Sequence, residues 1–245
     1  QKWNFPLHFI DFETCMIAIP FHKNRTPYEQ IAFQLSCHTL HEDGKIDHHE
    51  WIEKDANNFP NYEFVKALKT VLDNDNGSIF RYSPHENTVL LQIRTQMIAE
   101  DESKYKELTD WIDTVTYRKD IYTKKKIEGD RNMIDLWQYL KKYYYHPKMK
   151  GSNSLKYVLP AIFSTSDFIK NKYSEELNFG TNLKGFILWK IDNNNAVRNP
   201  YQLLENKYKK ININKDDLYF LDEKIEDGSA AMLAYAKLQF TDMLD

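Results

Sequence analysis

Asp11 and Glu13 lie two positions apart within the apolar run LHFIDFETCMIAI, residues 7–19. A run of this length, rich in Phe and Ile, predicts a buried β-strand. Residues i and i+2 of a strand share a face, so the two carboxylates would stand about 6.5–7 Å apart. Such a pair is costly to desolvate unless a cation compensates its charge. Two divalent ions held ~3.5–4 Å apart would do so. Alternatively, one acid bonds backbone amides and the other faces solvent.

Two further acids have ordinary interpretations when each is taken alone. Glu86 follows Ser83 by three positions, which matches a capping box in which the glutamate returns to the backbone N–H of the cap residue. Asp227 precedes the helix-forming segment GSAAMLAYAKLQF and suits an N-cap. Neither position justifies a functional assignment by itself.

The hydrophobic pattern predicts the elements that would position these acids. Strands over 31–40 and 45–52 are joined by the turn sequence HEDG, so the first three strands should form an antiparallel meander. Residues 100–130 predict a peripheral polar insertion, with a helix and a basic loop. We expect an α/β fold with helices on a central sheet, in one domain over 1–245. The other predicted elements are a strand over 77–82, a short apolar element over 133–140, and helices over 61–73, from Ser83, from near Ser154 and over 228–240.

Composition excludes several classes of protein. The chain has only seven glycines and contains neither G-x-G-x-x-G nor G-x-x-x-x-G-K-[ST], which argues against dinucleotide enzymes and P-loop ATPases. Cys15 and Cys37 make no disulfide framework, so we expect small core residues in a cytoplasmic protein. No apolar run approaches the ~18 residues of a membrane span, and we expect no membrane partner. Because the sequence begins with Gln1, we expect a domain excised from a longer protein.

Taken together, the acids resemble a known pattern. A strand carrying D-x-E, a second acid after a later strand and a last aspartate at a C-terminal helix resemble the DEDD exonucleases, the proofreading-type nucleases of the ribonuclease H-like superfamily. The segments HFIDFET, TPYEQIAFQLS, YSPHEN and YYYHPKMKGSNSLKYVLP resemble an uncharacterised bacterial domain family of that clan, sometimes fused to a CRISPR-associated-type nuclease domain. The resemblance covers the chain from His8 to about Phe240.

This resemblance implies a ribonuclease H-like mixed sheet, with antiparallel strands 1–3 plus parallel strands. It places Asp11, Glu13, Glu86 and Asp227 in the catalytic set, and Asp11, Glu13 and Asp227 as ligands of two Mg²⁺ or Mn²⁺ ions. The implied activity is 3′–5′ exonucleolytic hydrolysis of DNA or RNA.

The chain also departs from the family pattern. Position 86 is glutamate where most DEDD enzymes have aspartate, and Glu223 and Asp222 stand where those enzymes place a tyrosine or histidine. His85, His146 and Tyr219 are the candidates to replace that base.

Basic residues interleaved with tyrosines suggest where a nucleic acid would bind. Although the net charge is −3, lysines gather in three clusters, at 124–126, 141–150 and 207–210, and Tyr143, Tyr144 and Tyr145 lie within the second. This pattern is typical of a single-strand groove, and it predicts contacts from Tyr145, His146, Lys150 and Lys156 to single-stranded nucleic acid. The alternative is that the tyrosines alternate between core and surface, the lysines are solvated and the serines before Lys156 only cap a helix.

Two rival functions stay open at this point. The missing histidine or tyrosine near Asp227 indicates the first alternative, a degenerate ribonuclease H-like module that binds nucleic acid without cleaving it. A metal-free carboxylate pair, as in glycosidases, is the third possibility.

Overall fold

A computed structural model describes residues 3–56, 58–177, 184–193, 197–198, 203 and 228–240. The chain divides into two compact units, Gln1–Leu136 with Tyr235–Asp245, and Trp137–Ala234. Asp227, Tyr219 and the lysine cluster at 207–210 lie outside the described residues.

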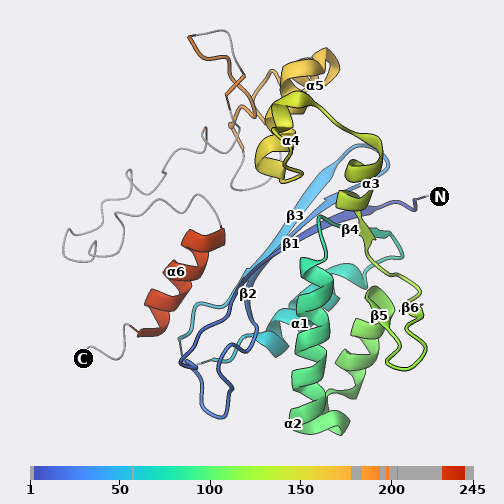
Figure 1. Ribbon diagram of the computed structural model, residues 1–245, viewed down its shortest axis with the longest axis vertical. Helices are drawn as coiled ribbons and strands as arrows, with labels where there is room; N and C mark the ends of the chain where they lie inside the picture. Colours follow the sequence, from blue (N-terminus) through green and yellow to red (C-terminus); the bar gives the residue numbers. More distant parts are fainter. Residues whose placement is uncertain are drawn as a thin grey trace. The chain divides into compact units, whose positions relative to one another are not determined.

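The first unit is built on a five-stranded mixed sheet with the strand order β3-β2-β1-β4-β7. Figure 1 labels β1 to β4 of this sheet. β1 pairs antiparallel with β2, and β2 with β3, so the predicted meander is confirmed. β1 also pairs parallel with β4, and β4 with β7. The fold is therefore α/β with a mixed central sheet. Its strands are β1 (Leu7–Cys15), β2 (Ile31–Leu40), β3 (Ile46–Ile52), β4 (Ser78–Arg81) and β7 (Ile134–Asp135).

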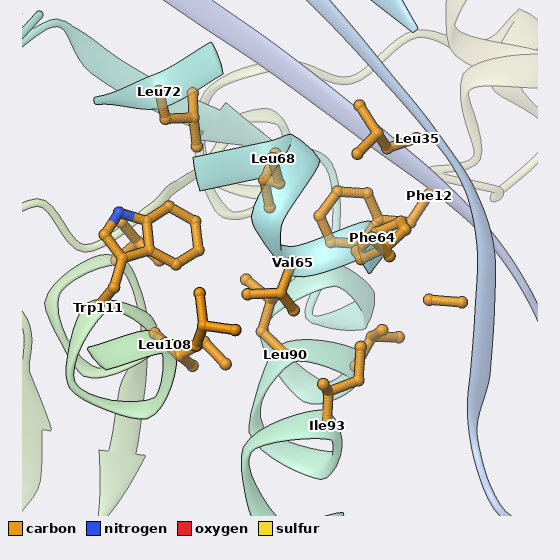
Figure 2. Packing of buried hydrophobic residues seen from close by; sticks show 14 of the residues in the cluster. Phe12, Leu35, Phe64, Val65, Leu68, Leu72, Leu90, Ile93, Leu108 and Trp111 are labelled. Atoms are coloured by element: carbon orange, nitrogen blue, oxygen red, sulfur yellow. The ribbon is translucent and has the colours of Figure 1, made fainter. Parts of the chain in front are cut away.

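Two helices, α1 (Asn61–Leu72) and α2 (His85–Val115), supply most of the core that packs on one face of this sheet (Figures 1 and 2). α1 presents Phe64, Val65 and Leu68 at helical spacing, and all three are fully buried. Phe64 meets Phe12 of β1 edge-on, with ring centroids 4.8 Å apart. Cys15 and Cys37 are buried and free, as predicted. Burial raises the pKa of Cys15 to about 12 and that of Cys37 to about 11, so both thiols stay protonated.

The segment 100–130 contributes more to the fold than its polar sequence indicates. α2 continues through it, with a break in helical geometry at Asp101 (φ −164°, ψ 98°). Beyond the break, Leu108 and Trp111 join the core (Figure 2), and Trp111 donates a hydrogen bond to Asp73 at 2.7 Å. The basic stretch that follows is a two-stranded antiparallel hairpin of β5 (Tyr117–Lys119) and β6 (Lys126–Glu128) instead of a loop.

The second unit is smaller and mainly helical in its described part. α4 begins directly after Ser154, as predicted, and the Ser154 hydroxyl accepts a hydrogen bond from the Lys156 amide at 3.4 Å. A small core of Met149, Val158 and Ala161 lies beneath this helix. No helix within the described ranges is long and apolar enough to cross a membrane. The elements are α3 (Leu136–Tyr143), the 3₁₀ helix η1 (Pro147–Met149), α4 (Leu155–Thr165) and α5 (Asp167–Lys172), while α6 (Gly228–Phe240) spans the boundary between the units.

Candidate active site

Asp11 and Glu13 share one face of β1, close to the end of the strand. Asp11 lies opposite Ser36 of β2, and Glu13 lies opposite Gln34. The register shifts directly after Glu13, because β2 contains one extra residue, Phe33, between the partners of Glu13 and Thr14. Bulges of this kind bend a strand and often lie beside active sites. Ile10 and Phe12 alternate with the two acids along the strand. Both point into the core and so fix the orientation of the acid pair.

Glu86 lies in the first turn of α2, and only 3% of its surface is exposed. Its Oε2 atom is buried and has no hydrogen-bond partner among the described residues. Burial raises the pKa of Glu86 to about 8, and the charges of Asp11 and Asp135 add to the effect. Its own backbone amide and Arg81 lower the pKa and offset only part of this shift. Glu86 is therefore a buried acid whose charged form the protein compensates only in part.

Asp11 is coupled to the same cluster. Its side chain reaches solvent, yet the protein atoms around the carboxylate disfavour the charged form. Burial therefore raises its pKa, while the Phe12 backbone and His85 act in the opposite direction. The interaction of Asp11 with Glu86 and the 3.3 Å contact of Thr14 with His85 show that the first turn of α2 and the end of β1 meet.

The turn between β4 and α2 is held by a buried ion pair. Arg81 and Asp135 are cross-strand partners on β4 and β7, and the Arg81 Nη1 atom lies 3.0 Å from the Asp135 carboxylate. Asp135 also accepts a hydrogen bond from the Ser83 amide at 3.1 Å, and Arg81 donates one to the Ser83 carbonyl. Ser83 itself has a φ of +99°, an unfavourable conformation for a non-glycine residue.

This arrangement shows that the capping-box interpretation of Glu86 is wrong. α2 begins at His85, with Pro84 as its N-cap residue and no side-chain cap hydrogen bond. The Ser83 amide, which the glutamate would have to reach, is already bonded to Asp135. The Glu86 carboxylate therefore does not make the capping-box bond to the Ser83 amide.

Of the three candidate bases, the structure places His85 beside the acids. Its Nε2 atom lies 3.3 Å from the hydroxyl of Thr14, directly after Glu13. Burial lowers the pKa of His85, although the charge of Asp11 opposes the shift. The imidazole is therefore neutral near pH 7 and able to accept a proton.

A divalent cation fits the chemistry of this site. The unpartnered oxygen of Glu86 and its repulsion with Asp11 are what a bound cation would relieve. Within the described ranges, no three His, Cys, Asp or Glu side chains are grouped as metal ligands. The structure thus brings together Asp11 and Glu86, with Glu13 on the same strand face as Asp11, while the predicted ligand Asp227 lies outside the described residues.

The predicted nucleic-acid-binding residues all belong to the second unit. Tyr145 is 76% exposed, whereas Tyr144 packs against the small core. His146 caps η1 by accepting a hydrogen bond from the Lys148 amide at 3.2 Å. Lys150, in the left-handed conformation after η1, and Lys156, in the first turn of α4, have exposed side chains.

Sequence reasoning missed Asp135 and Arg81, which position the turn that carries Glu86. The signal was present in MIDLWQYL, where a single carboxylate interrupts an apolar segment, as in the run around Asp11. A buried acid in such a run requires a partner.

Comparison with curated protein sequences and with solved structures gives no match. A family model, by contrast, matches residues 8–154, more than half of the chain, from β1 to the N-cap of α4. This range includes Asp11, Glu13, Glu86, Arg81 and Asp135. The chain belongs to the family described as Domain of unknown function (DUF2779).

Proposed function

We propose that this protein is a metal-dependent 3′–5′ exonuclease that hydrolyses phosphodiester bonds of DNA or RNA. The observation that carries the proposal is the buried Glu86 carboxylate, whose Oε2 has no partner among the described residues and whose charge interacts with Asp11. A sheet with antiparallel strands 1–3 and further parallel strands also agrees with the ribonuclease H-like arrangement that the sequence resemblance implies.

In this proposal Asp11, Glu13 and Glu86 hold divalent Mg²⁺ or Mn²⁺, with Asp227 as the further predicted ligand. Ions bound there supply the activation of water and the stabilisation of the leaving oxygen in phosphodiester hydrolysis. The chain's own residues provide the positioning. The Arg81–Asp135 pair fixes the turn that carries Glu86, and neutral His85 accepts a proton while Thr14 orients its ring.

The test is an assay on a single-stranded oligonucleotide labelled at its 5′ end, with Mn²⁺ or with EDTA. We expect progressive shortening from the 3′ end with Mn²⁺ and none with EDTA. Asp11→Asn and Glu86→Gln should each lower the rate by at least about 100-fold, because each removes a metal ligand. The matched control is Glu42→Gln, which removes an exposed carboxylate from the β2–β3 turn. Cleavage that persists in EDTA and in Asp11→Asn would overturn the mechanism and favour metal-free carboxylate chemistry.

The second candidate is a nucleic-acid-binding module that does not cleave. It is favoured by the finding that the described residues contain no group of three metal-ligating side chains. Salt-sensitive binding of the oligonucleotide without turnover, in Mg²⁺ and in Mn²⁺, is the result that distinguishes it.

A further inference from the structure

The β5–β6 hairpin is attached directly to the candidate active site. Asn87, the neighbour of Glu86, is 4% exposed and binds both backbone groups of Tyr117 at the start of β5. Its amide group donates to the Tyr117 carbonyl at 3.0 Å, and its oxygen accepts from the Tyr117 amide at 2.9 Å. Arg81, which holds the turn before α2, also lies over the Tyr117 ring, 5.7 Å from the centroid. The base of the hairpin and the acid cluster are therefore one connected structure.

The tip of the hairpin presents two apolar side chains to solvent on an ordered turn. Ile121 is 77% exposed and Tyr122 is 92% exposed. The carboxylate of Asp120 accepts hydrogen bonds from the amides of Tyr122 and Thr123, at 3.0 and 2.6 Å, and from the Thr123 hydroxyl at 2.8 Å. The turn is thus shaped by its own hydrogen bonds, which reduces the entropy lost when a ligand binds the tip.

Three lysines of the hairpin have no acidic partner among the described residues: Lys119 at the end of β5, and Lys124 and Lys125 in the turn. Lys119 and Lys126 face each other across the two strands, a placement that costs stability. Glu128 pairs with Lys126 at 2.5 Å. No carboxylate of the described chain forms an ion pair with Lys119, Lys124 or Lys125, and Asp120 is occupied by the turn.

We propose that the β5–β6 hairpin is a contact site for single-stranded nucleic acid, with Tyr122 and Ile121 packing on a base and Lys119, Lys124 and Lys125 meeting phosphates. The proposal deepens the proposed function and rests on it. Unpaired lysines beside an exposed aromatic ring are complementary to a strand that offers phosphates and flat bases at once. Since strands rise about 3.3 Å per residue, the tip lies within roughly 20 Å of Asn87. A strand held at the acid cluster can therefore extend to the hairpin.

The same combination of lysines and exposed apolar side chains also occurs on surfaces that bind anionic membranes. The connection through Asn87 to the carboxylates favours nucleic acid. Vesicles of anionic phospholipid therefore serve as a second probe in the test.

The experiment measures binding of a fluorescein-labelled oligothymidylate by anisotropy, in EDTA, at several salt concentrations. Ile121→Ser/Tyr122→Ser should weaken binding about tenfold, as expected for the loss of one stacked base. Lys119→Gln/Lys124→Gln/Lys125→Gln should reduce the slope of log K against log salt by about 2, because three phosphate contacts are lost. All five residues are exposed, so thermal unfolding of both variants should match that of the wild type.

Two matched controls separate this site from general surface effects. Phe168→Ser removes an aromatic ring that is 72% exposed in the second unit. Lys45→Gln/Lys66→Gln/Lys106→Gln removes three lysines that are each paired with a carboxylate. Both controls should leave affinity and salt slope unchanged.

Unchanged affinity and salt slope in the hairpin variants would overturn the proposal, as would tip-dependent binding to vesicles but not to the oligonucleotide. Binding is measured without cleavage, so the two proposals fail separately. Hairpin-dependent binding by a chain that never cleaves supports the contact site and removes the exonuclease. If the hairpin variants bind and cleave the oligonucleotide as the wild type does, the exonuclease is supported and the contact site is removed.

Discussion

The carboxyl group of Glu86 lies in an environment where ionisation costs free energy. Burial, Asp11 and Asp135 raise its pKa to about 8 from an ordinary value of 4.5, and Arg81 offsets only part of the shift. The folded chain therefore keeps a proton on Glu86 at neutral pH that the unfolded chain releases. A buried acid with an unpartnered oxygen stabilises a fold less than an apolar residue of the same size would. Under the proposed function, its role as a metal ligand accounts for this cost in stability.

The first prediction concerns the pH dependence of stability in EDTA. A group whose pKa is raised on folding contributes most below its unfolded pKa. The contribution of Glu86 should therefore be complete below about pH 4.5 and be lost progressively as the pH rises to about 8. Glu86→Gln removes this dependence and should be more stable than the wild type at pH 8 by a few kcal/mol. Urea unfolding at several pH values measures the difference between the two chains, and Glu42→Gln should retain the wild-type slope. An identical slope in Glu86→Gln would show that the acid is not perturbed.

The second prediction concerns His85, whose neutral imidazole lies beside Thr14 and interacts with Asp11. If His85 accepts a proton during hydrolysis, His85→Gln should lower kcat about 100-fold and leave KM nearly unchanged. The acidic limb of the pH–rate profile should also flatten, because the group that must be deprotonated is gone. His49→Gln is the matched control, since His49 is exposed on β3. An acidic limb that survives in His85→Gln would assign the base elsewhere.

At the scale of elements, the entry into α2 decides where Glu86 lies. The chain leaves β4 through Ser83 at a φ of +99°, a conformation that persists because Arg81 and Asp135 bind both backbone groups of this residue. An unfavourable conformation costs on the order of 1–3 kcal/mol and is kept where the surrounding structure over-determines it. Here the surrounding structure is a parallel strand pair, so the geometry of the site depends on β7.

The third prediction follows from this turn. Asp135→Ala leaves the buried Arg81 guanidinium without its partner and should destabilise the protein by roughly 3–5 kcal/mol. Ser83→Ala should cost less than about 0.5 kcal/mol, because the Ser83 hydroxyl accepts one 3.4 Å hydrogen bond, from the His85 amide, and lies before the N-cap residue Pro84. A capping serine would cost about 1 kcal/mol or more. Chemical unfolding of the two variants measures both values, and the reverse order would restore the capping box.

These elements also show what the sequence can predict. The β1–β2–β3 meander, α1 and the start of α4 follow from local periodicity, a turn sequence and a cap, and all were predicted. The partnership of Arg81 with Asp135 depends on parallel pairing between residues far apart in the chain, which no local pattern encodes. Ser83 and Glu86 have the spacing of a capping box, but the Ser83 amide donates its hydrogen bond to Asp135 instead of to Glu86. Leu108 and Trp111 lie in the polar segment 100–130, so the local sequence does not predict their burial. They are buried because they pack with α1 in the core.

At the scale of the molecule, a net charge of −3 hides a separation of opposite charges within the first unit. Acid side chains gather at the end of β1 and the start of α2, and unpaired lysines lie on the hairpin that Asn87 attaches to the same helix. A polyanion meets repulsion at the first region and attraction at the second. Cations at the acids would remove the repulsion, so metal binding and nucleic-acid binding should reinforce each other.

The last prediction tests whether a divalent cation that binds the acid cluster stabilises the folded chain. A ligand present at a hundredfold its Kd stabilises the folded state by about 2.7 kcal/mol. For a chain of this size that corresponds to a rise in Tm of roughly 5–10 °C. Mn²⁺ should therefore raise the Tm of the wild type and of Glu42→Gln in a thermal scan at pH 8, where Glu86 releases its proton most readily. Asp11→Asn/Glu86→Gln, which lacks both coupled carboxylates, should show a higher Tm without metal and almost no further rise with it. A Mn²⁺-dependent rise in Tm that survives in this double variant would place the ion outside the acid cluster. Glu86 would then not be a metal ligand, and its burial would need another cause.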